Sequence, residues 1–150
     1  MTVPSVLLQV ASNDDVTREM LFELYCILLR EFIEPLYGWD KEFQRKRFDS
    51  EYPSEKVQQI YVDAAFAGYT VVHERTESHH IALLLIRPEC QRVGIGRAVM
   101  KKLTSHARSC GRIVTLSSFT DNRRAIVFYQ SLGFAVNGIE SNFALLSSPA

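Results

Sequence analysis

Apolar residues recur along the chain with two spacings, one typical of helices and the other of strands. Side chains three or four positions apart, as at Val16, Met20 and Leu24, predict a helix with one buried stripe. Pro35 is expected to stop or kink this helix, and Asp40 to cap a second, short one. Two later helices are expected, over residues 94–110 and in the segment that follows the capping residues Asp121 and Asn122.

Short apolar runs between these helices predict strands. Residues 79–86 lack polar–apolar alternation, which favours a strand buried on both faces, and residues 59–63 and 66–74 predict a hairpin. Further strands are expected over residues 6–10, 113–119, 134–136 and 142–146. The order β-α-α-β-β-β-α-β-α-β-β predicts one domain, residues 1–150, of the α/β or α+β class, with helices on both faces of a sheet.

Composition removes several classes of protein. Seventeen basic residues balance seventeen acidic ones, so a uniformly basic nucleic-acid-binding protein is not expected. The longest apolar run, residues 81–86, is far below the ~20 residues that span a membrane. Cys26, Cys90 and Cys110 show no metal-ligand spacing, so no metal site is expected, and three unpaired thiols favour a cytoplasmic protein.

The most informative segment joins the strand at residues 79–86 to the helix that follows it. Gly94 and Gly96 allow close approach of a ligand to the main chain, and the helix begins with free N–H groups at its positive end. This combination favours an anion site, although a simple strand-to-helix turn would need the same glycines. The segment lacks both the third small residue of a dinucleotide fingerprint and the lysine of a P-loop.

The zero net charge hides an uneven distribution. Residues 87–112 carry seven basic side chains and one acidic one, whereas residues 1–86 carry fourteen acidic and eight basic ones. The positive block therefore coincides with the glycine segment and its helix, where an anionic ligand is expected.

Two motifs resemble the GNAT superfamily of N-acetyltransferases. Residues 91–96, Gln-Arg-Val-Gly-Ile-Gly, are similar to the family's Q/R-x-x-G-x-G/A signature, and residues 122–134 are similar to its N-x-x-A-x-x-F-Y-x-x-x-G-F segment. The two occur in the family's order. The resemblance implies a mixed, mainly antiparallel sheet of about six or seven strands, and acetyl-CoA as the acyl donor.

The resemblance also implies roles for individual residues. The main chain of Leu84, Leu85 and Ile86 is expected to pair with the pantetheine arm, and Asn122 to contact the same cofactor. Tyr129 is expected near the thioester sulfur, where its hydroxyl would act as general acid; as an alternative, it is a core aromatic. The residues expected to cradle the pyrophosphate are Arg92, Val93, Gly94, Ile95, Gly96 and Arg97.

The general base is left open among several groups. Some family members have a carboxylate where this chain has Ser117. His80 is one candidate because an unperturbed imidazole has a pKa near 6.5; as an alternative, it is a polar residue at the start of a strand. Glu74 and bulk water are further candidates, and a covalent route through Cys90 is disfavoured.

The predicted activity is transfer of an acetyl group from acetyl-CoA to a primary amine by direct attack in a ternary complex. The acceptor is a small amine, an amino acid derivative or a peptide N-terminus, and Tyr37, Trp39 and Asp40 are expected to line its pocket. These aromatics could instead form a small core between two helices. The rival hypothesis is a catalytically silent acyl-CoA-binding module. No nucleic-acid or membrane partner is expected, and the short C-terminal strands could pair with a second copy.

Overall fold

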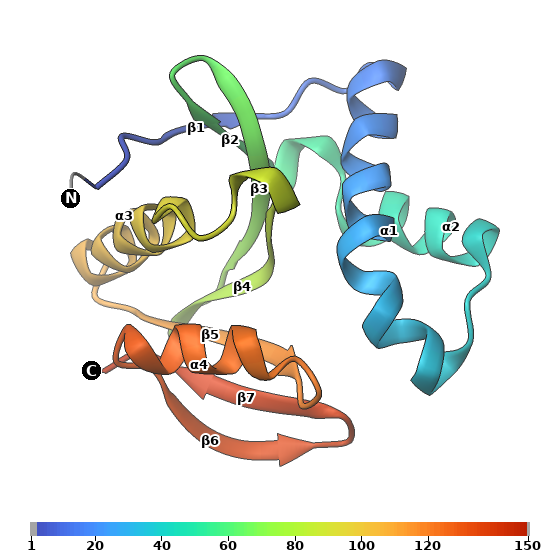
Figure 1. Cartoon of the computed structure of the whole chain (residues 1–150). Coiled ribbons are helices and arrows are strands. Elements are labelled where there is room, and N and C mark those ends of the chain that lie inside the picture. Colours follow the sequence, from blue (N-terminus) through green and yellow to red (C-terminus); the bar gives the residue numbers. More distant parts are fainter. Residues whose placement is uncertain (1–2, 150) are drawn as a thin grey trace. The chain divides into compact units, whose positions relative to one another are not determined.

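The computed structural model describes residues 3–149, and Figure 1 labels their elements along the chain. The elements are β1 (Leu7–Val10), α1 (Asp15–Tyr37), α2 (Lys41–Glu51), η1 (Ser54–Lys56), β2 (Val57–Val62), β3 (Ala65–Glu74), β4 (Ser78–Ile86), η2 (Pro88–Cys90), α3 (Ile95–Ser109), β5 (Ile113–Phe119), α4 (Arg123–Ser131), β6 (Ala135–Glu140) and β7 (Phe143–Ser147). Leaving aside the two 3₁₀ turns η1 and η2, this sequence of elements confirms the predicted order.

The strands pair in the order β1-β2-β3-β4-β5-β7-β6. The β1–β2, β2–β3, β5–β7 and β6–β7 pairs are antiparallel, whereas β4 and β5 run parallel, from Ser78–Ile113 to Ile81–Leu116. A parallel pair needs a crossover, and helix α3 supplies it. The mixed, mostly antiparallel sheet confirms the expected fold class.

Within the described residues the chain divides into two compact units. The first comprises residues 3–71 and 83–95, and the second comprises residues 72–82 and 96–149. Strands β3 and β4 therefore each begin in one unit and end in the other. No helix within residues 3–149 combines the length and the apolar character that crossing a bilayer requires.

The first unit is built around aromatic side chains from α1 and α2. Phe22 and Tyr25 lie against Phe48, with ring centroids 5.5 and 5.6 Å away. The guanidinium of Arg18 lies 4.5 Å from the Phe48 ring centroid and forms an ion pair with Asp49 at 2.9 Å, which compensates this buried charge. The Tyr69 hydroxyl donates to the carbonyl of residue 21 at 2.8 Å and ties β3 to α1.

Side-chain caps begin the first two helices, and a glycine ends the first. Asp14 accepts from the N–H of Thr17, and Asp40 accepts from the N–H of Phe43, as the sequence predicts for α2. Of the two effects expected of Pro35, stopping α1 does not occur, and a kink stays a prediction. The helix continues to Tyr37 because Gly38 donates to the carbonyl of Glu34 at 2.9 Å, a bond that does not need the missing N–H of Pro35.

The second unit has its own apolar core. Val99, Leu103 and Ala107 form a buried stripe on α3, spaced as the sequence predicts. Buried Val114 and Leu116 on β5 add to this core, as do buried residues of β7 and the segment after α4. The core thus holds α3, α4 and the C-terminal strands in one unit.

A close backbone approach between β3 and β4 shapes the first unit. A Cβ at Gly68 would lie 2.0 Å from the carbonyl oxygen of Leu85 and 3.0 Å from the Cα of Ile86. Both neighbours are backbone atoms of a paired strand and cannot rotate away. Only glycine fits at this position of β3.

We expect Gly68→Ala to destabilise the protein by at least about 2 kcal/mol, or roughly 4–8 °C in Tm, because the methyl group would push β4 from its partner. Gly138→Ala is the matched control on β6. No atom lies within 4 Å of its Cβ position, so its effect should stay within about 0.5 kcal/mol. Thermal unfolding of both variants checks this, and equal Tm values would refute the steric argument.

Candidate functional site

The C-terminal end of β4 is held by hydrogen bonds within the first unit. The Thr70 hydroxyl donates to the carbonyl of Leu83 at 2.7 Å, and the backbone N–H of Arg87 donates to Ala67 at 2.8 Å. The Arg87 guanidinium also donates to the carbonyl of Phe66 at 3.0 Å. These bonds fix where the strand ends and where the following loop begins.

The loop after β4 has two residues in the left-handed region. Arg92 has φ of 66° and Gly94 has φ of 91°, while Val93 between them does not have a positive φ. Alternating backbone handedness turns successive N–H groups toward one concave side, a geometry that binds anions. Arg92, Val93 and Gly94 are all exposed, so this backbone is open to a ligand.

Helix α3 follows the loop directly and adds its own N-terminal N–H groups. Its first three residues are Ile95, Gly96 and Arg97, and the first four N–H groups of a helix have no partner inside it. Such N–H groups and the positive end of the helix dipole favour an anion. The residues that sequence analysis predicts for the pyrophosphate are thus consecutive on this surface.

Close packing between two helices accounts for the glycine at position 96, which the sequence alone does not indicate. A Cβ there would lie 3.3 Å from the tip of the Phe128 ring, so this glycine lets α4 pack closely against α3 inside the second unit. Arg97 donates to the Ser131 hydroxyl at 3.3 Å, which also joins the two helices. The two glycines therefore have different structural roles: Gly94 allows the loop conformation, and Gly96 allows α3 and α4 to pack closely.

Tyr129 is buried on α4, with 9% of its surface exposed. Its ring lies 5.1 Å from the ring of Phe128 and 5.9 Å from that of Phe134, measured between centroids. Burial raises the pKa of Tyr129 well above its ordinary value, because a phenolate would lose its hydration. The side chain therefore keeps its proton at neutral pH, and its hydroxyl can donate a hydrogen bond there.

Asn122 is the N-cap of α4. Its side-chain oxygen accepts from the N–H of Ala125 at 3.2 Å, as its sequence position predicts. The side-chain NH₂ group is not needed for this cap, so Asn122 can still donate to a ligand.

His80 lies on β4 beside β5 in the second unit. Its Nδ1 is 2.9 Å from the hydroxyl of Thr115, the residue paired with it across the two strands. The pKa of His80 is lowered, first by burial and then by the positive charges of Arg75 and His73. Its ring is therefore neutral at physiological pH. Ser117 lies two residues after Thr115, on the same face of β5, and is exposed.

Glu74 and His79 belong to a different group of side chains from His80. Adjacent residues of a strand point to opposite faces, so His79 faces away from the His80 side of β4. Glu74 is 3.6 Å from the Nε2 atom of His106, and the His79 and His106 rings are 5.5 Å apart. Of the two base candidates on this hairpin, only His80 lies on the face that carries Thr115 and Ser117.

The residues predicted for the acceptor pocket lie between α1 and α2. The guanidinium of Arg30 stacks 5.3 Å above the Trp39 ring centroid, and a carboxylate oxygen of Asp40 is used as the α2 cap. Tyr37 is 60% exposed. A cation is therefore already present on one face of Trp39, and the pocket remains a prediction.

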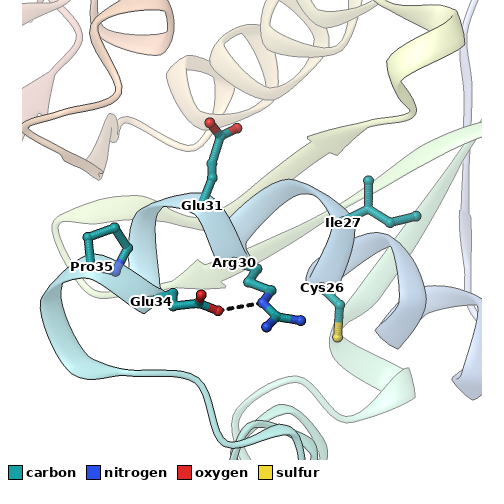
Figure 2. A pocket seen from close by; sticks show the side chains of 6 residues that line it. All are labelled: Cys26, Ile27, Arg30, Glu31, Glu34 and Pro35. Carbon is teal, nitrogen blue, oxygen red and sulfur yellow. Dashed lines mark hydrogen bonds and ion pairs between the residues drawn. The ribbon is translucent and has the colours of Figure 1, made fainter.

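A shallow depression lies beside this region on α1. Figure 2 shows the Arg30–Glu34 ion pair at 2.6 Å, with Cys26 and Ile27 one turn nearer the start of the helix. Burial raises the pKa of the Cys26 thiol, so it stays protonated and is a weak nucleophile. Arg30 belongs both to this depression and to the Trp39 stack.

The comparisons with known proteins show which class of proteins has this mixed sheet and glycine-containing loop after β4. The family model of the acetyltransferase (GNAT) family matches residues 20–134. The chain belongs to this family, whose members use acetyl-CoA as donor. No curated protein matches the sequence.

Several solved structures share the fold at low sequence identity. The chain is similar to PaiA N-acetyltransferase from Thermoplasma acidophilum in complex with coenzyme A, with 15% identity, a TM-score of 0.76, and 97% and 99% of the two chains covered. An acetyltransferase from Thermus thermophilus matches at 17% identity and a TM-score of 0.75 over both full lengths. A GNAT-family acetyltransferase from Listeria monocytogenes matches at 14% and 0.70, over 99% and 98% of the chains.

The lowered pKa of His80 makes protein stability depend on pH with a definite sign. Between this pKa and the ordinary value of about 6.5, the unfolded chain binds more protons than the folded one, so stability rises with pH. The contribution should be complete above about pH 6.5 and decline below it. His80→Gln removes this titration and keeps a hydrogen-bonding group. Urea unfolding across this range should show a smaller loss for the variant; equal losses would contradict the assignment.

Proposed function

We propose that the protein is an N-acetyltransferase that moves the acetyl group of acetyl-CoA to a primary amine by direct attack in a ternary complex. The observation that carries this proposal is the exposed loop with left-handed Arg92 and Gly94, which leads directly into α3. Membership of the acetyltransferase family supports acetyl-CoA as the donor. The protonated hydroxyl of Tyr129 supports the transfer step.

The chain's own residues account for donor binding in this proposal. The backbone N–H groups of residues 92–97 bind the pyrophosphate, and the main chain of Leu84, Leu85 and Ile86 hydrogen-bonds the pantetheine arm. The described β4–β5 register ends at Ile81, before these three residues. The free NH₂ group of the Asn122 side chain supplies a further donor.

Acetyl-CoA supplies an activated thioester carbonyl and a thiolate leaving group. Tyr129 gives its hydroxyl proton to that thiolate, which makes the leaving group neutral. Burial raises the pKa of Tyr129, so the proton is present before transfer; the role also requires that the thiolate approach the hydroxyl closely enough to draw the proton away.

His80 is the base of the proposed reaction. The amine must lose one proton when its nitrogen bonds to the acyl carbon, and a neutral imidazole accepts it directly or through a water. In this role the Nδ1–H group of His80 donates to the Thr115 hydroxyl 2.9 Å away, which holds the ring and leaves Nε2 unprotonated to accept the proton.

The acceptor in this proposal is a small amine, an amino acid derivative or a peptide N-terminus. Tyr37, Trp39 and Asp40 are proposed to line its pocket, with Arg30 as the group that a cationic acceptor must displace from Trp39. Glu34 can hold the displaced guanidinium, since the two already form an ion pair.

We further propose that the protein acts in the cytoplasm, where acetyl-CoA and reduced thiols occur together, and that two copies can pair through β6. Strand β6 is at the edge of the sheet and is mostly exposed, so its free backbone groups can pair with another strand.

Release of free thiol from acetyl-CoA in the presence of a panel of primary amines tests the proposed activity. We expect release with at least one amine, and a mass increase of one acetyl group on that amine. Thermal unfolding with CoA alone is run in parallel. Stabilisation by CoA without release from any amine would reject the enzyme and favour a silent acyl-CoA-binding module.

Tyr129→Phe tests the general acid. We expect kcat to fall by about 10²–10⁴-fold while the affinity for CoA stays nearly constant, because only the hydroxyl is removed. Tyr61→Phe, which removes a hydroxyl from strand β2, is the matched control. An unchanged kcat in Tyr129→Phe would remove this residue from the acid role. His80→Gln in the same assay should lower kcat if His80 is the base.

A further inference from the structure

Three potential metal ligands meet in the second unit, away from the groups used in acetyl transfer. Glu74 ends β3, His79 is the second residue of β4, and His106 lies in the last turn of α3. Each offers one ligand atom, and the three atoms all lie within 4.8 Å of one another. Glu74 and His106 are exposed, whereas His79 between them is buried.

His79 is buried, with 2% of its surface exposed, and its Nε2 atom has no hydrogen-bond partner among the described residues. A buried polar atom without a partner is rare, because it has given up its bond to water and received nothing in return. The neighbouring rings and carboxylate cannot explain it as an ordinary core histidine, since neither His106 nor Glu74 bonds to that nitrogen. A ligand that accepts an imidazole lone pair would satisfy it.

We propose that Glu74, His79 and His106 form a binding site for a divalent transition-metal ion, with Zn²⁺ as the best fit. Two imidazoles and one carboxylate are a ligand set that zinc uses, with water in the fourth position. Bonds of about 2.0–2.1 Å in a tetrahedral site place ligand atoms about 3.3 Å apart. The Glu74 carboxylate oxygen is already 3.6 Å from His106 Nε2.

The remaining adjustment falls on side chains that can move. The side chains of Glu74 and His106 are 67% and 61% exposed, so both can rotate toward His79, which is held by its burial. The site also lies at the C-terminal end of α3, where the negative end of the helix dipole favours a cation. His79 provides a fixed first ligand, and the two exposed residues close around the ion.

This site is distinct from the phosphate-binding end of α3. His106 is ten residues after Gly96, which corresponds to roughly 15 Å along the helix axis. The bound ion would join the β3–β4 hairpin to the last turn of α3 and stabilise the second unit. Its role is therefore structural or regulatory, and acetyl transfer does not require it.

Titration of chelator-treated protein with ZnCl₂, followed by calorimetry, tests the proposal. We expect one Zn²⁺ per chain and a higher Tm with zinc, since an ion that binds only the folded chain stabilises it. Glu74→Gln and His106→Gln should each weaken binding at least about tenfold. Glu77→Gln removes an exposed carboxylate from the same hairpin but outside the cluster, and should bind as the wild type does.

Co²⁺ in place of Zn²⁺ identifies the ligands, because the three cysteines could also bind zinc. We expect visible absorption of Co²⁺ with nitrogen and oxygen ligands and no thiolate-to-metal charge-transfer band. Three results would each overturn the proposal: no binding up to about 100 µM Zn²⁺, equal affinity in Glu74→Gln, His106→Gln and Glu77→Gln, or a thiolate band. All three variants change exposed side chains, so misfolding does not confuse the outcome.

Discussion

The close pairing of β3 with β4 around Gly68 is the constraint on which the position of the loop after β4 depends. A side chain at this position would collide with the carbonyl oxygen of Leu85, so the two backbones approach only because the residue is glycine. The Thr70–Leu83 and Arg87–Ala67 bonds continue the pairing to the end of β4. The loop that carries Arg92 and Gly94 starts from this fixed point. The end of β4 therefore anchors the loop, which has no large core of its own.

Strand alternation separates two kinds of chemistry on β4. His80 faces Thr115, and its lowered pKa suits proton removal at neutral pH. His79, one residue earlier, is on the other face with Glu74 and His106. A shift of one residue in the register would exchange the two histidines. The parallel pairing with β5, which sets Ser78 opposite Ile113, thus decides which histidine can serve acetyl transfer.

Local features could be predicted from the sequence because local physics decides them. The Asp40 and Asn122 caps follow from side-chain oxygens placed just before apolar helical patterns. The β4–loop–α3 segment follows from an apolar run and its glycines. Features that depend on packing between distant segments could not be predicted. The Phe128 ring against Gly96 is one, since nothing near residue 96 indicates that α4 lies over it.

The candidate ion site likewise could not be predicted from the sequence. Its ligands are five and 27 positions apart in the chain, on three different elements, so no spacing motif announces them. The cysteine spacings led instead to the expectation of no metal site. The stacking of Arg30 on Trp39 is similar, because an aromatic residue after a helix does not show which cation covers it.

Several basic side chains of residues 87–112 bond to other groups of the protein and are not reserved for a ligand. Arg87 pairs with Glu89 and a β3 carbonyl, Arg97 bonds Ser131, and Arg112 donates to the carbonyl of Thr76. These three guanidinium groups are engaged in contacts within the protein, and they still add to the local positive potential. In the proposed function, recognition of the donor's phosphates falls mainly on backbone N–H groups of the loop and α3, which are fixed in direction and cost little entropy to order. The sequence supplies the positive charge, and the left-handed backbone at Arg92 and Gly94 supplies the exposed N–H groups that the proposed phosphate site requires.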